Sequence, residues 1–291
     1  MKVISGLLRM GRKRVHCVGV GKSAILQLAL LLKTVLCLIT TTPVPSFHHQ
    51  RLPEWAVQKL HRDRVVVVPG YLEAAACEAL RNDMEQLREA GLFRQAGVGR
   101  TSTHRRDMDV RLTESCWLFP PPPPSLGDRA ARRELYAIVS DLTQQLSTPL
   151  RPLNRWEPEL AYLHYPEGGY YKRHFDVPAA LQLDGRGRVA SEERRVSFLL
   201  YLNTGWDAER GGELRVYAPL DEVAARRRRV EGQGGGMEIS EAAGHVWQDV
   251  VPEGGTLVCF YSDSVEHEVK PTKVERQVIV GWLRGACPAA A

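Results

Sequence analysis

The chain has 291 residues, 44% hydrophobic and 25% charged, so its composition is that of an ordinary globular protein with room for one large domain or two small ones. The net charge of +5 resides at the N-terminus, because eight of the 39 basic residues precede the first acidic residue, Glu54. The remaining 31 basic residues face 34 acidic ones, so no nucleic-acid partner is expected for the folded body.

Residues 1–53 are predicted to be a targeting or signal-anchor segment. A basic leader without acidic residues runs into the apolar stretch 24–42, which Lys33 interrupts. A lysine at the centre of an inserted helix costs about 2.5–3.5 kcal/mol, which weakens the interpretation as a membrane span. Three interpretations stay open: a transit peptide for a plastid or mitochondrion, a cleaved secretory signal, and a retained anchor. A membrane contact is expected only if residues 24–42 are a retained anchor.

Residues 54–157 are predicted to contribute N-terminal helices and strands that pack on the core of the fold. A short helix is expected around Glu54–His61, and the run Val65–Val68 predicts a strand that ends at a Pro-Gly turn. From Glu73 to Ala90, apolar residues recur at spacings of three and four, which predicts an amphipathic helix closed by Gly91.

The stretch Phe93–Asp109 lacks both the helical and the strand periodicity and is predicted to be a loop. Pro120–Pro124 is expected to be an extended spacer before a second amphipathic helix at Arg129–Leu146. The four cysteines outside the leader are widely scattered, which favours buried or free thiols over a zinc site or a disulfide framework.

Residues 158–285 change character to short β-type segments separated by glycine and proline, which predicts a sandwich or jelly roll. The fold class expected is α+β, mainly β: a double-stranded β-helix (jelly roll) with flanking helices. The segments are LAYLHYP, VSFLLYLN, GELRVYA, GTLVCFYS and RQVIVGWL. Asp221–Gln248, with its arginine and glycine runs, is expected to be a solvated insertion.

The segment YYKRHFDVP contains His174 and Asp176 two positions apart, and such residues of a strand point to the same face. A histidine and a carboxylate are two ligands for a divalent metal, and His267 is the candidate third. Two histidines and one carboxylate form the facial triad of non-haem Fe(II) oxygenases, which leaves coordination positions open. The spacing alone is a weak signal, because most histidines at strand ends are not ligands.

Arg276 heads the strand RQVIVGW, nine residues after His267. By strand alternation it shares a face with Val278, Val280 and Trp282. If this face points inward, the buried guanidinium needs an anion. Two candidates for this anion stay open: a bound dicarboxylate and a carboxylate of the protein itself.

Three segments, LHYPEGGYYKRHFD, RRVSFLLYLNTGWDAERGGELRVYAP and GTLVCFYSDSVEHEVKPTKVERQVIVGW, resemble the catalytic core of the 2-oxoglutarate- and Fe(II)-dependent dioxygenases, prolyl 4-hydroxylase type. The pattern is most similar to the hypoxia-type prolyl hydroxylases. Collagen-type and plant cell-wall prolyl hydroxylases have a lysine where this chain has Arg276. The resemblance covers about Pro158 to Gly285 and continues weakly upstream.

The resemblance implies that His174, Asp176 and His267 bind iron and that Arg276 binds the distal carboxylate of 2-oxoglutarate. Tyr201 would hydrogen-bond the same carboxylate, and Tyr165 and Trp282 would line the cosubstrate site. The implied reaction is hydroxylation of a prolyl residue in a polypeptide with dioxygen, releasing succinate and CO2, with L-ascorbate keeping the iron reduced. A small-molecule hydroxylase and a silent jelly-roll binding module are the alternatives.

Overall fold

The structure is a computed structural model, and it describes residues 50–98, 106–148, 152–154, 159–177, 192–217 and 247–286. All of these belong to one compact unit, Pro45–Ala291. Residues 1–49 of the leader, residues 221–246 of the insertion and residues 99–105 of the expected loop lie outside the described residues. Among the described residues, no helix is both long and apolar enough to cross a membrane.

Two antiparallel sheets form the body of the molecule. The larger sheet has seven strands in the order β1-β10-β7-β12-β5-β4-β2, and the smaller has five in the order β3-β6-β11-β8-β9. The larger sheet consists of β1 Val65–Val68, β2 Arg94–Gln95, β4 Glu114–Trp117, β5 Glu159–Tyr165, β7 Glu192–Tyr201, β10 Leu257–Tyr261 and β12 Arg276–Ala286. The smaller consists of β3 Arg111–Leu112, β6 Tyr170–His174, β8 Leu214–Tyr217, β9 Trp247–Val250 and β11 Glu266–Val269. The expected mainly β fold with flanking helices is confirmed.

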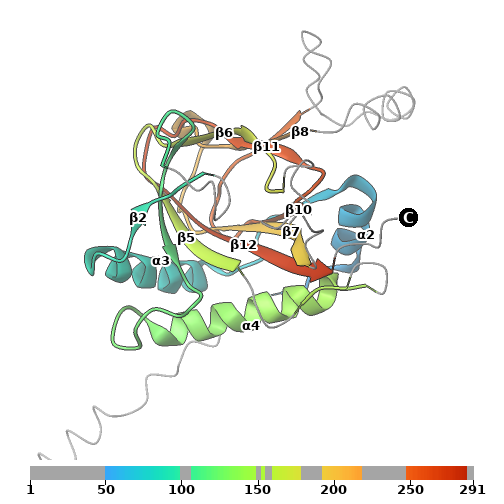
Figure 1. The fold of residues 1–291 in the computed structure, drawn as a ribbon, viewed down its shortest axis with the longest axis horizontal. Coiled ribbons are helices and arrows are strands. Elements are labelled where there is room, and N and C mark those ends of the chain that lie inside the picture. The colour runs from blue at the N-terminus through green and yellow to red at the C-terminus, as the bar shows by residue number, and fades with distance from the viewer. Residues whose placement is uncertain are drawn as a thin grey trace, which may run out of the picture. The chain divides into compact units, whose positions relative to one another are not determined.

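The described residues include three α-helices beside the sheets: α2 Glu54–Asp63, α3 Ala74–Glu89 and α4 Arg129–Leu146. Helices α3 and α4 lie on one side of the larger sheet, and β6, β8 and β11 lie on the other (Figure 1). The apolar stripe predicted for α3 is fully buried, and Gly91 follows the helix with a positive φ, as expected. The side chain of Asp128 caps α4 by accepting hydrogen bonds from the amides of Ala130 and Ala131.

The side chains of the larger sheet alternate between two apolar clusters. One face packs with α2, α3 and α4, and Tyr162 of β5 and Leu200 of β7 belong to it. The other face packs with Leu214 and Val216 of the smaller sheet, and Tyr165 and Tyr201 belong to that cluster. Strand periodicity therefore decides which residues can reach a site between the sheets.

The expected loop Phe93–Asp109 needs a correction, because it contains strand β2, which pairs with β4. The apolar pattern around Arg94 is too short for a periodicity to be visible. Cys77, Cys116 and Cys259 are buried and free, in line with the prediction. The boundary between residues 157 and 158 stays a prediction, because residues on both sides contribute to one core.

Candidate metal centre and cosubstrate site

His174 and His267 are directly opposite each other in the smaller sheet. His174 is the last residue of β6, His267 lies in β11, and the antiparallel register pairs the two. Their ring centroids are 4.3 Å apart. Strand pairing thus brings together two histidines that are far apart in the sequence.

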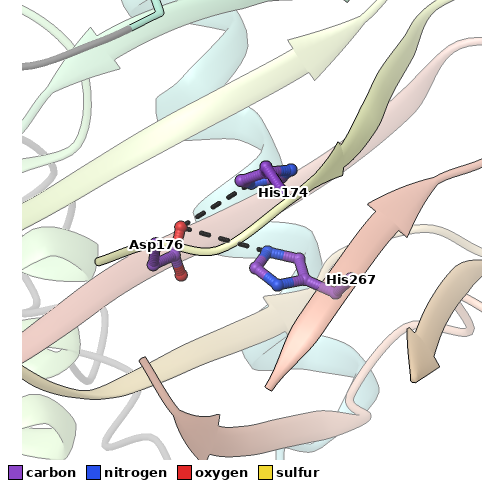
Figure 2. Close-up of side chains that lie close together, drawn as sticks. All are labelled: His174, Asp176 and His267. Carbon is purple, nitrogen blue, oxygen red and sulfur yellow. Dashed lines mark ion pairs between the residues drawn. The ribbon is translucent and has the colours of Figure 1, made fainter. Parts of the chain in front are cut away.

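Asp176 completes the group, but it lies outside the strand that was expected to hold it. β6 ends at His174, and Asp176 follows in a bend. Figure 2 shows one oxygen of its carboxylate facing both imidazoles. Its Oδ1 is 3.7 Å from Nε2 of His174 and 3.9 Å from Nε2 of His267. One donor atom from each of the three residues lies within 4.8 Å of the others.

Each of these residues uses one polar atom in a hydrogen bond and keeps a second one that can ligate a metal. Nδ1 of His174 lies 2.7 Å from the carbonyl oxygen of Lys172, and Nδ1 of His267 lies 3.2 Å from that of Val265. A carbonyl oxygen only accepts, so both Nδ1 atoms carry the proton and both Nε2 atoms keep a lone pair. Oδ2 of Asp176 accepts a hydrogen bond from Ser197, which leaves Oδ1 toward the histidines. The donor set fits a divalent metal with two nitrogens and one carboxylate oxygen.

The protonation states suit metal binding as well. Burial and the repulsion that it would experience from a protonated His267 lower the pKa of His174 to about 3, so its imidazole is neutral at neutral pH. Burial alone would raise the pKa of Asp176, but the attraction of its ionised form to the side chains of His267, His174 and Arg194 and the hydrogen bond from Ser197 outweigh it, and the pKa falls to about 2. Neutral histidine and ionised aspartate are the forms that ligate metals.

Aromatic rings enclose the two histidines. The ring of Tyr171 stacks on His174 with a centroid distance of 3.6 Å, and the guanidinium carbon of Arg111 lies 4.5 Å from the Tyr171 centroid. The ring of Phe260 lies 4.6 Å from that of His267. Phe260 belongs to the apolar cluster between the sheets, so the histidines border the same interior as Tyr165 and Tyr201.

Arg276, the first residue of β12, is fully buried on this interior face. Its Nε, Nη1 and Nη2 atoms have no hydrogen-bond partner among the described residues, and neither does the hydroxyl of Tyr201. The guanidinium carbon lies 4.7 Å from the ring centroid of Tyr165 and 5.1 Å from that of Tyr201. Burial raises the pKa of Tyr201 to about 12, against the opposing charge of Arg276, so its hydroxyl stays protonated as a donor. The arrangement fits the carboxylate end of a buried dicarboxylate.

The Gly-Gly pair before β8 allows this close packing. Gly212 has a φ of +74°, and a Cβ there would lie 3.1 Å from Cδ of Arg276 and 3.0 Å from Cβ of Thr272. A Cβ on Gly211 would lie 2.6 Å from the carbonyl oxygen of Pro271. Only glycine lets this turn lie against the stem of Arg276.

Trp282 shares the face of Arg276 but lies six residues further along β12, roughly 20 Å away at the rise of a strand. It is directly opposite Ser197, and the guanidinium of Arg194 stacks 3.8 Å from its ring centroid. The structure therefore places Trp282 near the Asp176 end of the site, whereas Tyr165 and Tyr201 contact Arg276. The cosubstrate role expected for Trp282 stays a prediction.

Ser197 and Ser262 were not among the predicted site residues. Both are fully buried, and their hydroxyl oxygens are 2.8 Å apart. One signal for Ser197 was present: it is the polar residue within the apolar run 196–200, and it shares the alternation of Tyr201.

Comparison with known proteins agrees with this geometry. Residues 160–284 match the family model of the 2OG-Fe(II) oxygenase superfamily. A prolyl 4-hydroxylase from Pseudomonas putida is 25% identical, with a TM-score of 0.55 over 79% of this chain and 97% of the other. A Trichoplax adhaerens prolyl hydroxylase, solved with a peptide of the hypoxia inducible factor, is 21% identical, with a TM-score of 0.56 over 78% and 86%. A search of the curated proteins found no match.

Residues 160–284 therefore match the 2OG-Fe(II) oxygenase superfamily, and the fold of the chain is similar to that of a prolyl 4-hydroxylase. Members of this superfamily use Fe(II) and 2-oxoglutarate, and the three uncommitted metal donors together with the unpaired guanidinium fit both.

Proposed function

We propose that this protein is a dioxygenase that hydroxylates a prolyl residue in a polypeptide and converts 2-oxoglutarate to succinate and CO2. His174, Asp176 and His267 would hold Fe(II) through two Nε2 atoms and one Oδ1 atom. The hydrogen bonds at both Nδ1 atoms and at Oδ2 support these roles, because they fix the side chains and leave the three donors free.

The observation that carries the proposal is the buried, unpaired guanidinium of Arg276. A charge without a partner in the interior is costly, so a fold that keeps one is expected to receive an anion there. Arg276 would bind the distal carboxylate of 2-oxoglutarate in a bidentate manner, and Tyr201 would donate to the same carboxylate. Tyr165 would cover the guanidinium through its ring.

When bound, iron and 2-oxoglutarate supply the oxidising power through the oxidative decarboxylation of 2-oxoglutarate by dioxygen. The protein's part is to orient the groups and to exclude water. Phe260 and Tyr171 shield the two histidines, and the apolar residues around Tyr201 keep the interior dry. L-Ascorbate as the reductant of the iron stays a prediction.

The prolyl substrate is proposed from the resemblance of this chain to prolyl hydroxylases, one of which matches over almost its whole length. The fold alone does not choose the substrate. A carbocyclase from nogalamycin biosynthesis, SnoK, shares it at 16% identity and a TM-score of 0.50. The deciding experiment is mass spectrometry of peptide pools after incubation with the enzyme, Fe(II), 2-oxoglutarate and ascorbate. We expect the mass of one oxygen to be added at proline, whereas hydroxylation of a free metabolite with no peptide product would favour a small-molecule enzyme.

We further propose that the segment between β2 and β3 helps to hold the peptide, since Arg100, Arg105 and Arg106 would favour acidic or carbonyl-rich stretches. Replacing residues 99–105 by a Gly-Ser linker leaves β2 and its pairing with β4 in place. We expect this variant to keep the slow 2-oxoglutarate decarboxylation that needs no substrate and to lose peptide hydroxylation. Equal loss of both activities would assign the segment a structural role.

A further inference from the structure

We propose that Ser197, oriented by Ser262, is a positioning residue that holds Asp176 as a one-oxygen metal ligand. The inference rests on the proposed metal site and adds two residues that contact no metal themselves. The hydroxyl of Ser197 lies 2.5 Å from Oδ2 of Asp176, the carboxylate oxygen that faces away from the histidine Nε2 atoms.

Counting protons fixes the direction of the two hydrogen bonds. The hydroxyl of Ser197 donates to Oδ2 of Asp176, so its single proton is used in that hydrogen bond. The contact of 2.8 Å between the two serine hydroxyls then has Ser262 as its donor. Ser262 thus selects the rotamer of the Ser197 hydroxyl, and the hydrogen bond to the charged carboxylate is of the stronger, charge-assisted kind.

The two serines belong to the larger sheet, whereas Asp176 follows β6 of the smaller one. Ser197 lies in β7, and Ser262 directly follows β10, the strand that pairs with β7. The backbone repeats the link, because the amide of Val177 donates to the carbonyl oxygen of Ser262 at 3.1 Å. Asp176 lies outside regular structure, so these bonds from the opposite sheet are what fix its carboxylate against the two histidines.

The hydrogen bond from Ser197 limits how Asp176 can coordinate a metal. A carboxylate that is free to rotate can bind a metal with both oxygens and occupy a position that the facial triad leaves open. With Oδ2 engaged by Ser197, only Oδ1 is presented to the metal. Outer hydrogen-bond partners of this kind typically contribute 10- to 100-fold to metal affinity.

The test measures metal binding without turnover. Mn(II) is titrated into the full-length, metal-free protein, and the loss of the sharp EPR signal of free Mn(II) gives the dissociation constant. The variants are Ser197→Ala, Ser197→Thr and Ser262→Ala. Thr143→Ala serves as the matched control, because Thr143 is a buried residue whose hydroxyl donates to a carbonyl within α4 and touches no site residue. Visible absorption of the Co(II) forms reports the coordination geometry.

We expect Ser197→Ala to bind Mn(II) at least about 10-fold more weakly and to change the Co(II) spectrum. Ser197→Thr keeps the donor and should restore both, Ser262→Ala should lie between, and Thr143→Ala should match the wild type. Wild-type affinity and spectrum in Ser197→Ala would overturn this inference alone. If Ser197→Ala does not fold, unchanged binding in Ser262→Ala overturns it instead. A wild-type protein that binds no Mn(II), or an Asp176→Ala variant that binds it equally well, would overturn the proposed metal site as well.

Discussion

Two buried arginines lie on opposite faces of the larger sheet, and their surroundings differ completely. Arg132 of α4 is 3% exposed and forms an ion pair with Asp83 of α3, while its Nη2 donates to the carbonyl oxygen of Leu126. Asp83 in turn accepts hydrogen bonds from Tyr162 and from the amide of Asp128. Arg276 is 0% exposed and has no hydrogen-bond partner among the described residues.

The difference distinguishes an arginine that stabilises the fold from one that is expected to bind a ligand. Around Arg132, the protein supplies the carboxylate and satisfies its remaining oxygen, so the network joins α3, α4 and β5. Around Arg276, the described part of the chain supplies aromatic rings, and none of its carboxylates pairs with the guanidinium. A buried charge needs a partner, so the partner of Arg276 is expected to come from outside the chain.

The largest effect is expected at the metal ligands. His174→Ala, Asp176→Ala and His267→Ala should each reduce 2-oxoglutarate turnover to background, because a triad that loses one ligand no longer holds the metal in the required geometry. Succinate formation coupled to oxygen consumption is the measurement. Thr143→Ala is the control and should keep the wild-type rate. Wild-type turnover in all three variants would remove the metal assignment.

The sequence predicts much of this fold because the main elements have strong local signals. The periodic stripe of α3 and the β-branched runs of β1 and β12 are visible without knowledge of the rest of the chain. Strand β2 has only two residues, and its partner β4 is distant in the sequence, so no local pattern marks it.

The site was predictable in its residue types and less so in its geometry. The inward face of Arg276 follows from strand alternation and is confirmed. The expected position of Asp176 within a strand is wrong, because β6 ends at His174. Where a strand ends depends on its pairing with other strands. Ser197 and Ser262 could not be predicted as site residues from the sequence. Their role arises from a contact between two sheets, which no spacing along the chain indicates.

The paired arginine should matter most for stability. Arg132→Met should lower the free energy of unfolding by about 3–5 kcal/mol, because it leaves the carboxylate of Asp83 buried without its counter-charge. Urea unfolding of the metal-free protein measures this. Arg276→Met should leave that free energy unchanged or raise it, since no protein partner is lost. Equal destabilisation by both substitutions would contradict the distinction between the two arginines.

The ionisation of Asp83 should make stability depend on pH. Burial raises the pKa of Asp83 to about 6, although Arg132 and Tyr162 act in the opposite direction. Between about pH 4 and pH 6 the folded protein holds this proton more tightly than the unfolded chain, so stability should fall as the pH rises, by about 3 kcal/mol in total. Comparison of urea unfolding curves across this range should show a flatter dependence in Asp83→Asn, and Glu78→Gln, an exposed site on the same helix, should keep the wild-type slope.

The unpaired arginine should matter for cosubstrate binding. Arg276→Ala should weaken 2-oxoglutarate binding by about 1.5–3 kcal/mol, the value of a hydrogen bond to a charged group. Arg276→Lys should recover only part of this, because an ammonium group lacks the planar fork of the guanidinium. The dependence of turnover on the 2-oxoglutarate concentration gives the apparent affinity, and an unchanged value in Arg276→Ala would exclude the residue from the site.

The metal triad and Arg276 are proposed to form one site for Fe(II) and 2-oxoglutarate. The most direct test is an anaerobic titration of the Fe(II)-loaded protein with 2-oxoglutarate, followed by the charge-transfer absorption of the chelate. We predict saturation at one 2-oxoglutarate per iron and one iron per chain, with weaker binding in Arg276→Ala and no chelate in His267→Ala. A wild-type protein that forms no chelate, or one whose chelate forms equally well in both variants, would contradict the account.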